Sequence, residues 1–306
     1  MVNSAKSFLS KRPFFSVLLA IIPIVWCIWA LQFEQLNELL ISHSGFVFLG
    51  VLGAIFANST GAGGGVIFIP VFSALGMSPE QMVSTSFAIQ CFGMTVGAIT
   101  WIWHYLAHHQ HDATWQAFYR FVIVGALCSI AGLWSSNVAQ IAAPVSLHTS
   151  FSWFSIVLGI IIIWHGMRPG SSTLNSNLGN NLSQTYHRLD IFMIMLISFI
   201  GGIITSWLSV GVGEIIVIYL MLRGYCTKLA IATGVVVSAI TVWSMSPLSF
   251  ALSGETQFDV LLFAGPGAMI GGLYAKRIAL WFSITRLKLF FAFWIILTGA
   301  VMLVLN

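Results

Sequence analysis

The chain has 306 residues, of which 58% are hydrophobic and only 7% are charged, and its net charge is +4. Soluble domains have about 25% charged residues, so this chain has too little polar surface to coat a globule of its size. The composition excludes nucleic-acid binding as a main role, because that needs clustered Lys and Arg. Four isolated cysteines without a CxxC pair exclude a disulfide scaffold and a cysteine zinc site. We expect an integral membrane protein.

Seven apolar stretches are long enough to cross a hydrocarbon core of about 30 Å, which takes about 20 residues of helix. They cover residues 14–31, 82–104, 115–135, 149–167, 228–250, 258–275 and 287–305. The first follows three basic residues, but it is longer than a signal-peptide core and no small-x-small cleavage site follows it. We therefore expect it to be a retained helix.

Two further apolar stretches, 45–76 and 193–222, are interrupted by glycine-rich breaks. The first is broken from Asn58 to Gly65, and the second from Ser206 to Glu214. We expect half-helices of about 11–14 residues on either side of each break, too short to cross alone. Each stretch is then either one broken helix that crosses or two half-helices that enter the membrane and return.

The basic residues distinguish these two arrangements. With two re-entrant hairpins and a cytoplasmic amino terminus, all 12 Lys and Arg residues fall on the cytoplasmic side, and the carboxyl terminus lies outside. If both stretches cross, Arg120, Arg168 and Arg188 move outside. Because short cytoplasmic loops are enriched in Lys and Arg, the re-entrant arrangement is favoured.

The two hairpins belong to an internal repeat. An offset of 148 residues aligns Gly53, Gly63, Gly65, Gly76 and Thr85 with Gly201, Gly211, Gly213, Gly224 and Thr233. An offset of 140 residues then aligns Gly125, Gly132 and Gly159 with Gly265, Gly272 and Gly299. Each unit has one hairpin and three spans, and because three is odd, the second unit is inverted relative to the first. Inverted repeats with discontinuous helices are an architecture of secondary transporters.

We therefore predict an all-α integral membrane protein with two inverted repeats and one extra amino-terminal helix. Each repeat has a re-entrant or discontinuous helical hairpin and three transmembrane helices. The predicted parts are an amino-terminal helix with an extracytoplasmic loop (1–44), the first repeat (45–167), a cytoplasmic linker (168–192) and the second inverted repeat (193–306).

The glycine breaks predict an anion site near the middle of the membrane. Unwound backbone there leaves N–H and C=O groups that must find partners. The half-helices that follow the breaks direct free N–H groups and positive dipole ends at the loops, which favours negative charge. The predicted binding residues are Asn58, Ser59, Thr60, Gly61, Gly63, Gly64, Gly65, Thr85, Ser86, Ser209, Gly211, Gly213 and Thr233, and Ser84, Gln90 and Ser206 are further polar residues beside the loops. The alternatives are close helix packing for the glycines and bonds to the i−4 carbonyl for the hydroxyl groups.

Glu214 is the only acidic residue predicted deep in the membrane. An ionisable residue in that position is a functional candidate by default. Beside an anion, we expect it to hold a proton that it donates to the ligand, and loss of that proton would expel the ligand. Glu214 is thus a candidate for proton coupling. The alternative is a carboxylate that caps the adjacent half-helix.

The sequence predicts no metal site, no cofactor and no catalytic residues. His104, His108, His109 and His111 stand with Asp112 at the end of a span, but their spacing matches no defined metal site. An intramembrane enzyme would need a Ser-His pair, paired aspartates or a His/Glu metal cluster inside the spans, and none stands at a suitable depth.

The motif from Gly61 to Pro70 (GAGGGVIFIP), followed by Ser84-Thr85-Ser86, resembles the first-repeat signature of the sulfite exporter TauE/SafE family of membrane permeases. The second repeat, from Gly211 through Thr233, matches more loosely, and the segment 266–272 is similar to the family's later glycine-rich helix. The resemblance covers residues 45–305. In the second repeat, Val212 interrupts the glycine run and Ile218 stands where the first repeat has Pro70.

The resemblance implies a secondary transporter of a sulfur-containing anion, such as sulfite or an organosulfonate, in the cytoplasmic (inner) membrane of a bacterium. We expect alternating access, with the small anion and membrane lipids as the partners and no nucleic acid. A negative cytoplasm favours outward movement of one negative charge by about 2.3 kcal/mol per 100 mV, which favours export. The alternatives are a carboxylate carrier or an anion channel and, with less support, an intramembrane enzyme. The sequence indicates no oligomeric state.

Overall fold

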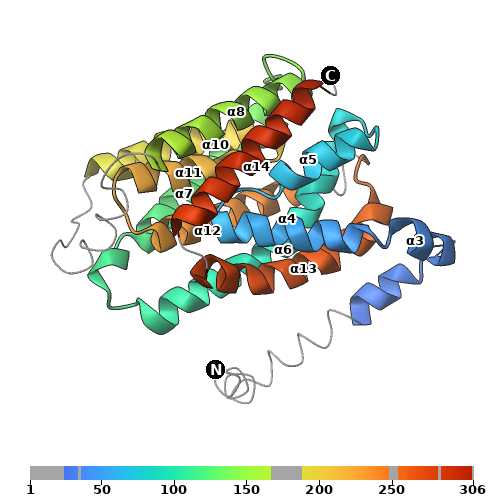
Figure 1. Cartoon of the computed structure of the whole chain (residues 1–306), viewed down its shortest axis with the longest axis horizontal. Coiled ribbons are helices and arrows are strands. Elements are labelled where there is room, and N and C mark those ends of the chain that lie inside the picture. Colours follow the sequence, from blue (N-terminus) through green and yellow to red (C-terminus); the bar gives the residue numbers. More distant parts are fainter. Residues whose placement is uncertain (1–23, 34–35, 167–187, 248–253, 282–283, 305–306) are drawn as a thin grey trace. The chain divides into compact units, whose positions relative to one another are not determined.

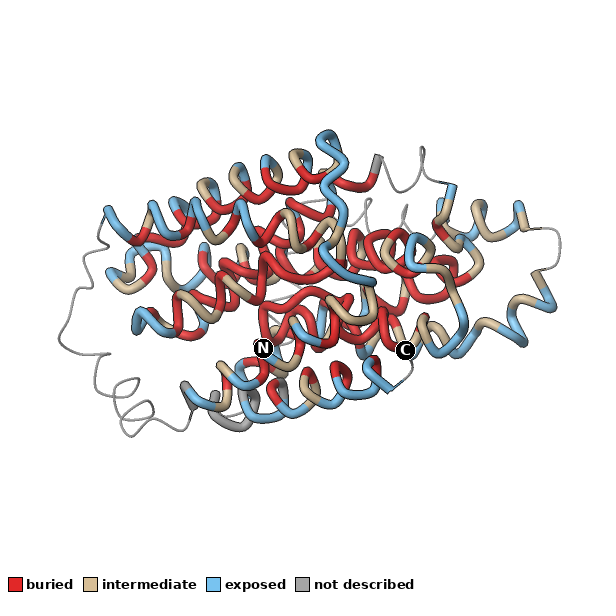
Figure 2. The backbone as a smooth tube through the Cα atoms, turned by 90° about the horizontal axis from the view of Figure 1, so that it is seen from above, coloured by how far each residue is buried: buried red, intermediate tan, exposed pale blue. Residues whose placement is uncertain are grey.

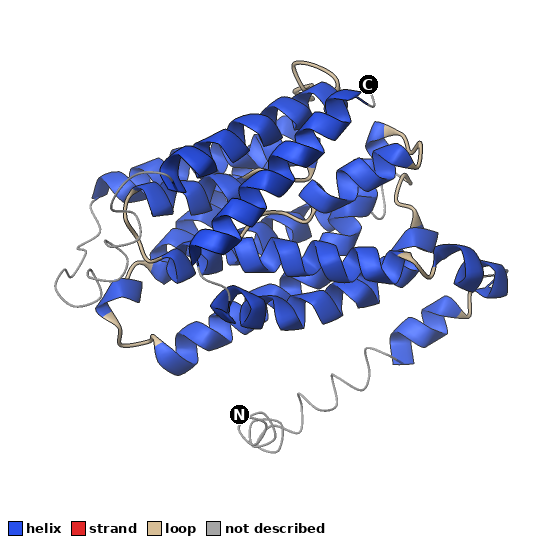
Figure 3. Cartoon of the chain, viewed as in Figure 1, coloured by secondary structure: helices blue, strands red, loops and turns tan. Residues whose placement is uncertain are grey.

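The computed structural model describes residues 24–33, 36–166, 188–247, 254–281 and 284–304. It divides into two units, Met1–Ser44 and Gly45–Asn306. In the first unit, residues 24–30 are helical and α3 spans Leu36–His43, while most of the predicted span 14–31 lies outside the described residues. The regular structure in the described ranges is entirely helical (Figure 3).

The second unit contains the helices that matter for the site. They are α4 (Phe46–Thr60), α5 (Gly65–Ala74), α6 (Pro79–His108), α7 (Phe118–Val138), α8 (Leu147–Gly166), α10 (Arg188–Leu208), α11 (Val212–Leu222), α12 (Thr227–Pro247), α13 (Phe258–Trp281) and α14 (Ile284–Val304), with a 3₁₀ turn at Ala113–Trp115. Six helices of the described part, including α6, α10 and α12, are by themselves long and apolar enough to cross a membrane. Large apolar side chains such as Leu127, Trp153 and Phe293 are exposed, while the facing sides of the helices are buried (Figure 2). An apolar exterior of this kind suits lipid, so the chain is an integral membrane protein.

The first interrupted stretch folds back on itself. α4 ends at Gly61, which has a φ of +84° and donates its N–H to the Ala57 carbonyl at 2.9 Å, a left-handed cap that suits glycine. After the break, α5 runs back toward the end where α4 begins (Figure 1). The ring of Phe68 on α5 fills the space beside Gly53 on α4, where a Cβ atom would collide with it. The stretch is a hairpin of two short helices.

The second interrupted stretch also folds back, and Asp190 joins its two ends. The buried Asp190 carboxylate, at the start of α10, accepts hydrogen bonds from Tyr219 Oη at 2.9 Å, Tyr225 Oη at 2.8 Å and Arg223 Nε at 2.7 Å, all at or just after α11. Burial, followed by the bond to Asp190, raises the pKa of Tyr225 above its usual range. Because the beginning of α10 meets the end of α11, the chain enters and leaves this hairpin on one side.

The prediction of two short half-helices was wrong for the first half of stretch 193–222. α10 has 21 residues and is long enough to cross by itself, because it begins at Arg188 and continues to Leu208. Ser206, expected to open the break, stays helical, because its hydroxyl bonds back to the Ile203 carbonyl at 2.7 Å. The preceding Thr205 bonds in the same way to the Gly201 carbonyl, also at 2.7 Å. The break is therefore confined to residues 209–211.

Equivalent helices of the two repeats begin or end at the same offsets as the repeated glycines. α4 and α10 end 148 residues apart, at Thr60 and Leu208, and α6 and α12 begin 148 residues apart. α7 and α13 begin 140 residues apart. The helix contacts are also reciprocal between the two repeats. α4 of the first repeat lies against α13 of the second, and α10 of the second lies against α7 of the first. The equivalent helices α6 and α12 contact each other, and α8 contacts α14. The repeated sequence thus corresponds to repeated helices with reciprocal partners.

Candidate functional site

The two breaks meet inside the protein, and the Glu214 carboxylate joins them. Gly63 in the first break donates its N–H to Oε1 of Glu214 at 2.7 Å, and Gly211 in the second donates to Oε2 at 2.8 Å. Glu214 lies in the first turn of α11 and is only 2% exposed. Its two oxygens therefore accept one N–H group from each repeat, which is the acceptor-only pattern of a carboxylate.

Gln90 on α6 makes a second bridge between the breaks. Gly64 donates its N–H to Oε1 of Gln90 at 2.8 Å. The Gln90 amide nitrogen donates to the carbonyl and hydroxyl of Ser209, at 3.1 and 2.8 Å, and to the hydroxyl of Ser86 at 3.0 Å. Ser209 in turn donates to Ser86 at 2.9 Å. The break of the first repeat, that of the second and the start of α6 are joined in one buried polar network.

Glycine lets the two loops approach this closely. A Cβ atom at Gly65 would lie 2.7 Å from the carbonyl oxygen of Ser209, and one at Gly213 would overlap the carbonyl oxygen of Gly61. Gly211 has a φ of +141°, a value that residues with a side chain rarely adopt. Ser209 has a φ of +58° and occupies, 148 residues later, the position of the left-handed Gly61. The backbones therefore pack directly against each other.

Several of the predicted binding residues lie at this meeting point. Gly63 and Gly64 donate into the network, Gly65 and Gly213 pack at the crossing, Gly211 donates to Glu214, and Ser86 and Ser209 bond to Gln90.

Other predicted residues bond elsewhere. The hydroxyls of Ser59 and Thr60 bond to the Phe56 carbonyl, although Thr60 also accepts the N–H of Ala62 at 3.3 Å. The Thr233 hydroxyl bonds to Leu229 four residues earlier. These are the local bonds that hydroxyl groups make within helices.

Asn58 and Thr85 connect helices around the site. The Asn58 side-chain amide donates to the carbonyls of Ala54 and Gly93, and the main-chain carbonyl of Asn58 accepts from the Trp101 indole at 2.9 Å. Thr85 accepts the N–H of Gln257 at 3.0 Å. Their side chains bond to the surrounding helices instead of the glycine loops.

Two residues near the loops were not predicted. Thr205 accepts the N–H of Val212 at 3.0 Å and so caps α11 from the preceding helix. Ser238 on α12 is 3% exposed and lies against Gly213, and its hydroxyl has no hydrogen-bond partner among the described residues. Ser238 stands 25 residues beyond Gly213 in the sequence, so no local motif connects them.

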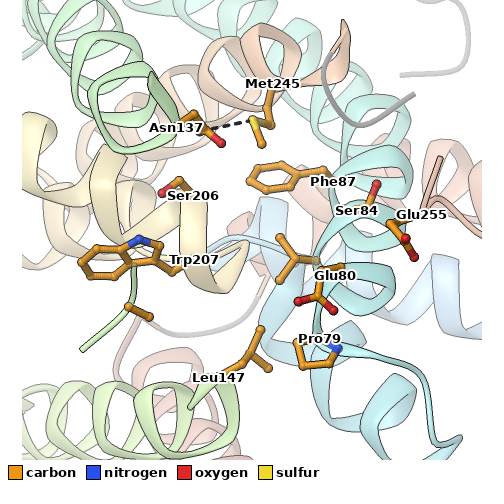
Figure 4. A pocket seen from close by; sticks show the side chains of 12 residues that line it. Pro79, Glu80, Ser84, Phe87, Asn137, Leu147, Ser206, Trp207, Met245 and Glu255 are labelled. Carbon is orange, nitrogen blue, oxygen red and sulfur yellow. Dashed lines mark hydrogen bonds between the residues drawn. The ribbon is translucent and has the colours of Figure 1, made fainter. Parts of the chain in front are cut away.

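An open cavity of about 350 Å³ lies between α6, α7, α8, α10 and α12 (Figure 4). Glu80 and Glu255 line it, together with Trp207, Phe87 and Ser206. Phe87 directly follows Ser86, and Ser206 lies three residues before Ser209. The cavity therefore approaches the network from the end of the helices that carries these two carboxylates.

Histidines lie at the other end of α6, beside Lys276 of α13. Lys276 lies over the Trp103 ring at 4.8 Å, and the ring of His104 is 5.0 Å from those of His108 and His109. The described ranges contain no group of three His, Cys, Asp or Glu residues that could hold a metal ion. Burial raises the pKa of Asp112, but its bonds to Thr114 and His109 outweigh this and hold it below the usual range.

The fold and the buried loops define the class of protein. Helices that span a membrane, interrupted inside the protein by glycine breaks whose N–H groups point at a shared site, are features of membrane transporters. A family model described as Sulfite exporter TauE/SafE matches residues 46–302, and the chain therefore belongs to this family of membrane permeases. The resemblance drawn from the glycine motif is thereby confirmed. None of the curated proteins and none of the solved structures compared with the chain matches it.

Proposed function

We propose that the protein is a secondary transporter that exports a small sulfur-containing anion, such as sulfite or an organosulfonate, across the cytoplasmic membrane of a bacterium. The observation that carries the proposal is the convergence of the Gly63, Gly64 and Gly211 N–H groups on one buried place from two hairpins. N–H groups at helix starts bind oxyanions without a full positive charge. The substrate would lie among these groups and the hydroxyls of Ser86 and Ser209.

Alternating access would arise from movement of the two repeats around this site. The reciprocal packing of α4 on α13 and α10 on α7 supports an inverted repeat, whose halves can rock against each other. The cavity beside Phe87 and Ser206 offers a path to one side. On the other side the path is closed by a buried apolar cluster that includes Trp101, Tyr105 and Trp115.

The charges favour export through that cavity. Glu80 and Glu255, which line it, are predicted on the outer side, with the amino terminus cytoplasmic and the carboxyl terminus outside. Carboxylates at an outer mouth would disfavour the return of a released anion. A negative cytoplasm adds about 2.3 kcal/mol per 100 mV for each negative charge that leaves.

Glu214 is the candidate for proton coupling, because it is the buried acid in contact with both breaks. If its proton is part of the cycle, Glu214→Gln removes the pH dependence of transport. Proteoliposomes with internal and external pH varied separately would measure this. A variant with the wild-type pH profile would eliminate the coupling role.

A carboxylate carrier is the second candidate. The observation that favours it is that the site already accommodates a carboxylate, that of Glu214. The test of both candidates is efflux from proteoliposomes loaded with sulfite, thiosulfate, methanesulfonate or acetate under an inside-negative potential. The proposed function predicts saturable efflux of the sulfur oxyanions, whereas selective efflux of acetate would favour the second candidate and efflux of neither would refute both.

A further inference from the structure

The glycine breaks are already occupied by an anionic group of the protein itself. The two oxygens of the Glu214 carboxylate accept the N–H groups of Gly63 and Gly211 at 2.7 and 2.8 Å, one from each repeat. These are the N–H groups that the proposed substrate needs. A substrate oxyanion and this carboxylate cannot both accept them, because each N–H group supplies one hydrogen.

We propose that Glu214 is a tethered competitor of the substrate: its carboxylate holds the two breaks together in the empty transporter, and the substrate binds by replacing it. The inference rests on the proposed anion transport. Charge-assisted bonds of 2.7–2.8 Å are strong, and the one from Gly63 links residues 151 positions apart in the sequence. A merely local cap would need only the bond to Gly211, which stands three residues before Glu214.

The geometry of the bridge also selects the substrate class. The two N–H groups are bound by two oxygens on one atom, so a replacement needs two oxygens on one central atom at a similar separation. Sulfite, sulfonates and carboxylates have this arrangement, whereas a halide presents a single centre. The site therefore matches bidentate oxyanions better than it matches chloride.

Glu214→Gln tests the competition. A Gln amide has one accepting oxygen and one donating nitrogen, so it cannot accept from both N–H groups, and it leaves no charge for the substrate to displace. Glu38→Gln is the matched control, because Glu38 is an exposed carboxyl on α3 and lines neither the cavity nor the network. The measurement is calorimetric titration of the full-length purified proteins with sulfite, methanesulfonate and chloride.

We expect Glu214→Gln to bind sulfite at least about tenfold more tightly than the wild-type protein, with Glu38→Gln within about twofold of wild type and chloride bound more weakly than sulfite by all three. Loss of a structural contact alone would leave affinity unchanged or weaken it. Equal or weaker sulfite binding by a folded Glu214→Gln protein overturns the competition while leaving the transport proposal intact. If no oxyanion binds any of the proteins, the transport proposal fails and the competition with it.

A second variant covers the case in which Glu214→Gln does not fold. Glu214→Asp keeps the charge but is one methylene shorter, so it can keep one of the two bonds and not both. We expect it to bind sulfite more tightly than wild type. Wild-type affinity in this variant would overturn the competition.

Discussion

The close approach of the two breaks at Gly65 gives a graded test of the shared site. A Cβ atom at Gly65 would lie 2.7 Å from the Ser209 carbonyl oxygen and 2.7 Å from a Val210 methyl group, against ordinary contacts of 3.4–4 Å. A Cβ atom at Gly63 would clash less severely, because its nearest neighbour, Gln90 Oε1, would lie 3.2 Å away. At Gly45, which directly precedes α4 and has a φ of −58°, nothing lies within 4 Å.

Because the clash at Gly65 is partly with backbone, Gly65→Ala must push the breaks apart. Overpacking of this kind costs about 1–3 kcal/mol. If that cost falls on the binding-competent state, transport drops by about fivefold to a hundredfold, since about 1.4 kcal/mol is a factor of ten.

The assay is sulfite efflux from proteoliposomes at matched protein content, with monodisperse elution as the check on folding. The expected order of rates is Gly45→Ala equal to wild type, then Gly63→Ala, then Gly65→Ala. If folded Gly65→Ala transports as fast as Gly45→Ala, the reasoning that the breaks form one site is refuted.

Three further substitutions test the interactions around the site. Gln90→Leu leaves the Gly64 N–H and the Ser209 carbonyl without their partner, so we expect thermal unfolding in detergent to show a loss of about 1–3 kcal/mol, and an unchanged transition would contradict the network. Asp190→Asn places an amide donor among three donors and should lower stability by about 1–3 kcal/mol in the same measurement. Most of this loss comes from the bonds to the two tyrosines, because Arg223 is 47% exposed and its ion pair is screened by solvent. Asp112→Asn should lower stability at neutral pH but not in acid. A carboxyl whose pKa is depressed on folding stabilises the folded protein above its unfolded pKa of about 3.9 and loses that contribution as the pH falls through the folded value. A difference from wild type that persists unchanged in acid would contradict this.

The order of the glycines predicted the hairpins and the repeat, because glycine allows two backbones to approach closely. Gly63 and Gly65 meet the second break, as expected, and the helix ends follow the same offset of 148 residues. The length of α10 could not be predicted in the same way. Ser206 was predicted to open the break, but a hydroxyl that bonds back to its own helix is compatible with either structure.

The hydrogen-bond partners of the polar side chains could not be predicted from the sequence either. Thr233 and Ser86 are both small hydroxyl residues beside a break, yet one bonds to its own helix and the other to Ser209 across the repeats. Glu214 offered two interpretations, a proton carrier or a cap. Its second bond, to Gly63, depends on how the two hairpins meet, and that is a property of the tertiary fold.

The central claim is that the N–H groups of both breaks bind the transported anion. Selenite is the heavier analogue of sulfite, and its selenium can be located by anomalous scattering in crystals of the full-length protein. The account predicts a selenium peak beside Gly63 and Gly211, with the Glu214 carboxylate moved away from at least one of these N–H groups. A selenite bound at saturation only elsewhere, with both Glu214 bonds intact, would contradict it.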